Sequence, residues 1–369
     1  MLPCHYTKNC NNFKHYICYT IGMLFSRFIN FCKKNARVSI AFALGIVVGA
    51  LGWHYQRQIT RPGRLAQRTE NVWNQIYPLR TKSEDNVFTA PLLGYELPES
   101  IGLPEYKPLE EKIGSLIQEK IKQGNATNIA TYFRDHNRGR WVGVNENDQF
   151  SPASLLKVPL MMVYYKIAQT DPSRLQNKLT YQGGENLNAI ERIRPSQELT
   201  LGTSYTVDDL INRMIIHSDN NATQLLLGNL DRNTLRDLFS DLGIQLPENG
   251  QPSDYLSAKS YSLFFRLLYN ATYLNEEFSE HALSLLAQTE FKEGLAAGVP
   301  GDIPVAHKFG EYEGDTGAEL HDCGDIYFSE NPYLLCIMTK GNNLDSLKNI
   351  IKDISNLVYD EMRHQYANK

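Results

Sequence analysis

Apolar positions at a helical spacing open the region that follows residue 105. Over 109–122, apolar residues recur three or four positions apart between charged ones, which predicts an amphipathic helix. Two short runs, 129–134 and 140–144, are separated by His136-Asn137-Arg138-Gly139 and predict a strand, a turn and a second strand. A further helix is expected over about 153–168.

The middle of the chain is predicted to be mostly helical up to about residue 243. Thr206-Val207-Asp208-Asp209 is a capping signal for a helix that ends near His217, and another helix is expected over 261–269. The pattern then returns to strands. We expect these strands over 305–309, 323–328 and 333–339, with a final helix over 344–363. Strands on both sides of a long helical insert favour an α+β fold with a separate all-helical lobe, and a site in the crevice between lobes.

One apolar run near the N-terminus stands apart from this pattern. Val38–Tyr55 contains no Asp, Glu, Lys or Arg, and as a helix it would be about 27 Å long, just enough to span a bilayer. We therefore predict a basic N-terminal segment (1–37), a transmembrane or signal-anchor helix (38–55), a linker (56–105) and a globular domain (106–369). A cleaved secretion signal and a start at Met23 stay open as alternatives.

Charge divides the chain at a similar place. The first acidic residue is Glu70, and residues 1–69 hold ten Lys and Arg residues. The rest of the chain holds 27 basic and 41 acidic residues, so its globular part is a poor electrostatic match for nucleic acid. An acid-free basic segment before such a domain is typical of a membrane-proximal segment, and we expect no nucleic-acid partner.

Cysteine spacing gives no sign of a metal site. The chain has no CxxC and no His-paired metal spacing, so we expect no metal and no cofactor. Cys323 and Cys336 fall on two strands joined by a turn at Glu330-Asn331-Pro332. A disulfide diagonally across this hairpin is one alternative, but we expect two buried free thiols.

The first motif that carries candidate chemistry is Ser154-Leu155-Leu156-Lys157, the only S-x-x-K in the chain. Residues three apart share a helix face, so the Lys157 amine can reach the Ser154 hydroxyl. It could take the serine proton if burial or a nearby cation lowers its pKa. The free backbone N–H groups at a helix start suit an oxyanion hole.

Two further motifs lie downstream. In Ser218-Asp219-Asn220, the hydroxyl could pass a proton to a leaving nitrogen, and the amide could hold both a lysine and a substrate carbonyl. In Lys308-Phe309-Gly310, the lysine could attract a substrate carboxylate and the glycine would allow close backbone approach. Each motif alone has a plain structural explanation. Their combination and order are what make the signal specific.

The three motifs together resemble the S-x-x-K, S-D-N and K-T-G triplet of class A β-lactamases and penicillin-binding proteins. The resemblance covers roughly Tyr106 to the C-terminus and implies an antiparallel sheet flanked by helices. It also implies a serine hydrolase that acts on β-lactams or peptidoglycan D-Ala-D-Ala peptides, outside the cytoplasmic membrane. The implied roles are Ser154 as nucleophile, Lys157 as base partner, Ser218 and Asn220 as proton shuttle and substrate ligand, Lys308 as electrostatic anchor, and the backbone N–H groups of Ser154 and Glu311 as oxyanion donors.

Two departures from the family pattern affect the expected activity. Phe309 stands where the family usually has a hydroxyl residue that contacts the substrate carboxylate. The loop glutamate of the E-x-x-L-N pattern, which activates the deacylating water, is absent between residues 243 and 261. Glu248 and Asp254 are the only candidates there, and we expect both to be solvated. A β-lactamase, a D,D-carboxypeptidase-type penicillin-binding protein and a catalytically weak binding module therefore stay open. His307 and His321 are expected to be strand residues, not ligands.

Overall fold

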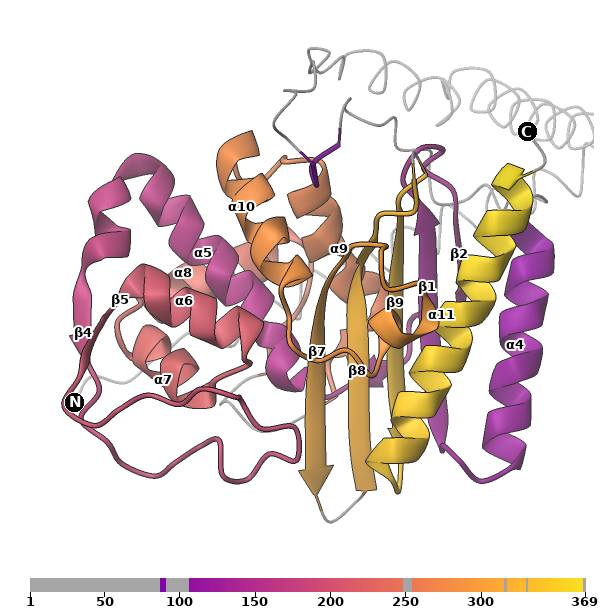
Figure 1. The fold of residues 1–369 in the computed structure, drawn as a ribbon, viewed down its shortest axis with the longest axis horizontal. Helices are drawn as coiled ribbons and strands as arrows, with labels where there is room; N and C mark the ends of the chain where they lie inside the picture. Colours follow the sequence, from indigo (N-terminus) through magenta and orange to yellow (C-terminus); the bar gives the residue numbers. More distant parts are fainter. Residues whose placement is uncertain (1–86, 91–105, 248–253, 315–316, 330, 368–369) are drawn as a thin grey trace, which may run out of the picture. The chain divides into compact units, whose positions relative to one another are not determined.

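The computed structural model describes residues 87–90, 106–247, 254–314, 317–329 and 331–367 (Figure 1). The predicted membrane segment Val38–Tyr55 and Glu248 lie outside these residues. In the part of the chain that is described, no helix is both long enough and apolar enough to cross a membrane.

A five-stranded antiparallel sheet forms the centre of the domain, with strand order β2-β1-β9-β8-β7. The first strand along the chain, β1, pairs with the last, β9, from Asn128↔Lys340 to Asp135↔Tyr333. Strands from both sides of the helical insert therefore share one sheet, as the pattern predicted. The strands are β1 (Asn128–Asp135), β2 (Trp141–Val144), β7 (Val305–Gly314), β8 (Gly317–Ile326) and β9 (Tyr333–Gly341).

Helices cover both faces of this sheet. On one face, α4 (Lys107–Lys122) and α11 (Leu344–Ala367) pack together and share an apolar cluster with the strands (Figure 1). A second cluster joins the other face to the helical lobe. The helices on that side are α5 (Lys157–Thr170), α6 (Val207–Ile216), α7 (Asn220–Gly228), α8 (Arg232–Asp241), α9 (Ala258–Tyr269) and α10 (Glu276–Ala287). The α+β fold with a helical lobe is thus the predicted one.

Several predicted boundaries are wrong, for identifiable reasons. The strand expected over 323–328 is β8, which begins at Gly317, because Glu319, His321 and Asp322 are polar but buried on the strand. Helix α9 begins at Ala258 because Ser257 caps it and forms a capping box with Ser260.

The stretch before residue 243 is less helical than predicted. Residues 181–203 contain no helix and connect two short strands, β4 (Lys178–Thr180) and β5 (Ser204–Thr206), which pair with each other. The helix expected after Thr206 is present as α6, and the Thr206 hydroxyl accepts the backbone N–H of Asp209 at 3.1 Å. This irregular connection lies against the motif residue Asn220.

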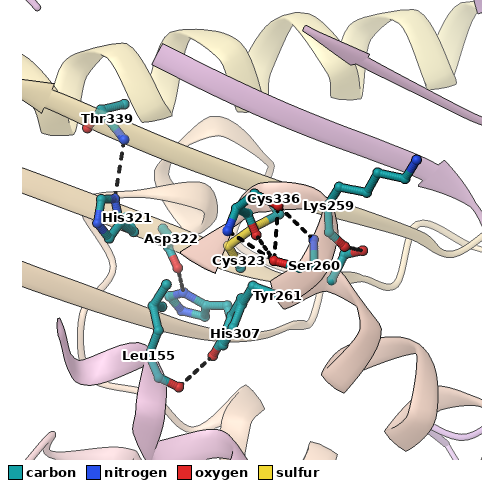
Figure 2. The surroundings of a disulfide bond; sticks show 12 residues. Leu155, Lys259, Ser260, Tyr261, His307, His321, Asp322, Cys323, Cys336 and Thr339 are labelled. Carbon is teal, nitrogen blue, oxygen red and sulfur yellow. Dashed lines mark hydrogen bonds and ion pairs between the residues drawn. A yellow bond between two sulfur atoms is a disulfide. The ribbon is translucent and has the colours of Figure 1, made fainter. Parts of the chain in front are cut away.

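The expectation of two free thiols is also wrong. Cys323 of β8 lies directly opposite Cys336 of β9, and the two form a disulfide (Figure 2). The pairing is direct and not diagonal because the hairpin closes with Ile326 opposite Tyr333, three positions away on each strand. Both cysteines are fully buried.

Candidate active site

The Ser154 turn joins the sheet domain to the helical lobe. Ser154 lies in the 3₁₀ turn Ala153–Leu156, which runs directly into α5 at Lys157. The turn is held by Tyr261, whose hydroxyl donates to the Leu155 carbonyl at 3.0 Å (Figure 2). Ala153 has a φ of 45°, a conformation that a non-glycine residue adopts only where its surroundings impose it. Ser154 itself is half-buried, and its hydroxyl makes no hydrogen bond with the described residues, so it is free to meet a substrate.

Lys157 is buried beside this turn, with 3% of its surface exposed. Its Nζ donates to the Ser218 carbonyl at 2.7 Å, to Ser218 Oγ at 3.0 Å and to Asn220 Oδ1 at 2.6 Å. Burial lowers the pKa of Lys157 to about 7, against the opposing effect of nearby carboxylates. A substantial fraction of this lysine is therefore neutral near pH 7 and able to accept a proton.

Lys308 approaches the same hydroxyl from strand β7. Its Nζ donates to Ser218 Oγ at 2.9 Å and to the Phe309 carbonyl at 3.0 Å. Its burial and the charge of Lys157 hold the pKa of Lys308 well below its usual range. Ser218 Oγ thus accepts from two lysines, which uses both of its lone pairs and leaves its own proton to be donated elsewhere.

Gly310 lets strand β7 pass against the Ser154 turn. A Cβ at Gly310 would lie 3.1 Å from both the Leu155 backbone nitrogen and the Pro152 carbonyl oxygen. The preceding residue, Phe309, is buried and packs against Phe291, with tilted rings whose centroids are 4.5 Å apart. Its ring centroid also lies 4.1 Å from Lys308 Nζ. An aromatic ring therefore occupies the position where the family usually has a hydroxyl.

The irregular connection 181–203 supplies contacts that the motifs did not reveal. Asn188 is fully buried, accepts the Asn220 backbone N–H at 2.7 Å and donates to Asp219 Oδ1 at 3.0 Å. Glu191 Oε1 accepts from Asn220 Nδ2 at 2.8 Å. No periodicity marks these residues in the sequence, so the pattern gave no signal for them.

Glu311 follows Gly310 on strand β7. Its carboxylate accepts the backbone N–H of Ile193 at 2.7 Å, which ties the connection to the strand. Burial, together with the neighbouring Glu191 carboxylate, raises the pKa of Glu311 to about 7. The sequence singled out Glu311 for its backbone N–H alone, and its buried side chain is a second feature of the site.

The remaining candidates have other partners. Asp254 is paired with Lys340 at 3.1 Å. His307 and His321 lie on strands, as predicted. His307 Nδ1 lies 2.7 Å from Asp322 Oδ1 (Figure 2). His321 Nε2 lies 2.9 Å from the Ser151 carbonyl. Over the residues that the structure describes, no group of His, Cys, Asp and Glu could hold a metal ion.

Comparison with known proteins agrees with the class that this fold and geometry define, a serine hydrolase related to β-lactamases. The model of the β-lactamase enzyme family matches residues 108–362, and the chain belongs to this family. No curated protein sequence matches the chain.

Solved structures share its fold. PBP-A is 21% identical with a TM-score of 0.59, over 74% of this chain and 99% of PBP-A. A PBP-A variant in an acyl-enzyme complex with penicillin G is 23% identical with a TM-score of 0.60, over 71% of this chain and all of the variant. A β-lactamase from Sphaerobacter thermophilus is 19% identical with a TM-score of 0.58, over 67% of this chain and 95% of that enzyme.

Proposed function

We propose that the protein cleaves β-lactams or D-Ala-D-Ala-like peptides through a covalent ester on Ser154. The observation that carries this proposal is the convergence of Lys157 and Lys308 on Ser218 Oγ, beside the Ser154 turn. A fluorescent penicillin should therefore label the protein. An absence of labelling would favour the alternative of a binding module that keeps the fold without the chemistry.

Acylation would move one proton from Ser154 to the leaving nitrogen through Lys157 and Ser218. Neutral Lys157 takes the proton of Ser154 as its Oγ attacks the substrate carbonyl, and the new negative charge on oxygen is stabilised by the backbone N–H groups of Ser154 and Glu311. The C–N bond then breaks, and the leaving nitrogen receives the proton of Ser218. Lys157 returns a proton to Ser218, and Lys308 keeps that hydroxyl in position.

If Lys157 is the base, its titration determines how the rate constant of acylation depends on pH. Because its pKa is about 7, its neutral fraction falls about tenfold per pH unit below that value. The second-order rate constant of acylation should rise with pH up to about 7 and then level off. Rates measured from pH 5 to 9 with benzylpenicillin would show this.

A variant of Glu311 separates this titration from that of the neighbouring acids. The charges of Glu191, Asp219 and Glu311 all raise the pKa of Lys157. In Glu311→Gln, one of these charges is lost, so the midpoint of the rise should move to lower pH. A flat profile below pH 7 in the unmodified protein would contradict the assignment of Lys157 as base.

The substrate class within this proposal depends on how fast the ester is hydrolysed. A β-lactamase and a D,D-carboxypeptidase-type penicillin-binding protein share the acylation step. Phe309 removes a hydroxyl from the expected carboxylate site, and the E-x-x-L-N pattern that carries the loop glutamate of class A β-lactamases is absent between residues 243 and 261. Both features favour behaviour closer to a penicillin-binding protein.

We also propose that the domain works outside the cytoplasmic membrane, attached through Val38–Tyr55. The apolar run, the cell-wall substrates and the buried disulfide Cys323–Cys336 support this, since disulfides persist mainly in oxidising compartments. Alkaline phosphatase, which needs export for its own disulfides, should be active when fused after Lys369. A fusion active only with a cytoplasmic reporter would refute the proposal.

A further inference from the structure

The amide of Asn220 is fully engaged before any substrate arrives. Its Oδ1 accepts from Lys157, and its Nδ2 donates to Glu191 Oε1 at 2.8 Å and to the Leu187 carbonyl at 3.3 Å. A substrate carbonyl that accepts from this amide must therefore displace one of its two hydrogen bonds, the one to Glu191 or the one to Leu187. The bond to Leu187 is the longer and weaker one, so a substrate carbonyl would displace it first and would then lie beside the Glu191 carboxylate on the same amide.

A second carboxylate beside Glu191 is short of donors. Glu311 has 7% of its surface exposed, and its Oε2 has no hydrogen-bond partner among the described residues. The guanidinium of the nearby Arg192 does not satisfy this oxygen, because it binds Glu313 at 2.8 and 3.2 Å. The two buried lysines of the site donate to Ser218 and its surroundings instead.

We propose that Glu191 and Glu311 together bind a primary ammonium on the acyl side of the substrate, on the carbon next to the carbonyl that Asn220 holds. This rests on the proposed function and specifies its substrate class. An ammonium has three N–H donors, so it can donate to Glu191 in addition to Asn220 and also reach the unpaired oxygen of Glu311. A substrate without it leaves the buried Oε2 of Glu311 without a donor, which is costly.

The electrostatics of the pair agree with this role. Burial and the Glu191 carboxylate raise the pKa of Glu311 to about 7, so near neutral pH a proton competes with any cation for this carboxylate. A bound ammonium would take the place of that proton. The ammonium would also neutralise negative charge near the reacting carbonyl, whose oxygen becomes negative during acylation.

Two penicillins test the proposal because they differ only at the relevant carbon. Ampicillin carries an α-amino group beside its side-chain carbonyl, and benzylpenicillin has hydrogen there. The measurement is the second-order rate constant of acylation for each, from competition with a fluorescent penicillin. We expect ampicillin to react about tenfold faster, the effect of one charge-assisted hydrogen bond.

Three variants assign the preference to the carboxylate pair. In Glu191→Gln and in Glu311→Gln, the ratio of the two rates should fall towards one. In Glu313→Gln, an exposed neighbour bound to Arg192, the ratio should stay as in the unmodified protein. Because each measurement is a ratio within one protein, a partial loss of folded protein does not affect it.

The outcomes distinguish a failure of the ammonium site from a failure of the proposed function. Equal rates for both penicillins in the unmodified protein would overturn the ammonium site and leave the acyl-enzyme intact. So would a preference for ampicillin that persists in both Glu191→Gln and Glu311→Gln. A protein that neither penicillin acylates would overturn the proposed function, and the ammonium site with it.

Discussion

Replacing Lys157 with Met is expected to slow acylation by about a thousandfold, the scale of a positioned general base. Lys157 Nζ makes three hydrogen bonds within the site, two to Ser218 and one to Asn220. Its burial disfavours the charged form and keeps part of the population neutral. Methionine fills a similar volume but can neither accept the serine proton nor return one to Ser218.

The matched control is Lys166→Met, on the same helix. Lys166 is exposed and donates to the Tyr273 carbonyl at 2.7 Å, away from the motif residues. Its acylation rate should stay within about twofold of the unmodified protein, since surface substitutions rarely have large effects. Acylation of the Lys157 variant at a near-normal rate would mean that another group takes the serine proton.

Deacylation is expected to be slower than acylation by roughly 10²–10⁴, the contribution of a positioned base, so the acyl-enzyme should accumulate. The E-x-x-L-N glutamate is absent, and Asp254 is occupied with Lys340. Lys157 is neutral again once it has returned its proton to Ser218, but its Nζ is held by Ser218 and Asn220, and no second base stands in for the missing glutamate in the family pattern. This corresponds to about 3–5 kcal/mol of barrier in the second step.

Stopped-flow hydrolysis of a chromogenic cephalosporin measures both steps. We expect a burst of about one equivalent of product per protein, followed by slow turnover. Rapid multiple turnover without a burst would show that another residue supplies the base. Glu191, through its contact with Asn220, and Glu248 would then be the first candidates, and Glu191→Gln would distinguish them.

The fold could be predicted because its strands and helices follow simple patterns at most positions. Strand β1 and helix α4 have apolar residues at the expected spacing, and both were placed within two residues of their observed ends. Strand β8 was misplaced because its buried polar residues obtain partners from distant segments. His321 binds the Ser151 carbonyl, and Asp322 binds His307, which no local pattern can show.

The site was only partly predictable for a similar reason. Motif residues such as Lys157 and Lys308 belong to short sequence motifs that can be recognised locally. In the structure both lysines donate to Ser218 Oγ. Glu191 lies in an irregular connection that was expected to be helical. Its position depends on tertiary contacts, among them the bond between Asn188 and the Asn220 backbone. Such a residue can be assigned to the site only from the folded structure.

The most direct test of the account is the mass of the protein after reaction with benzylpenicillin. Intact-mass analysis should show one adduct of the mass of the whole penicillin, since ring opening releases no leaving group, and peptide mapping should place it on Ser154. Ser154→Ala should give no adduct, while Ser151→Ala, three residues earlier, should still react. An adduct that persists in Ser154→Ala, or that maps to another residue, would contradict the central claim.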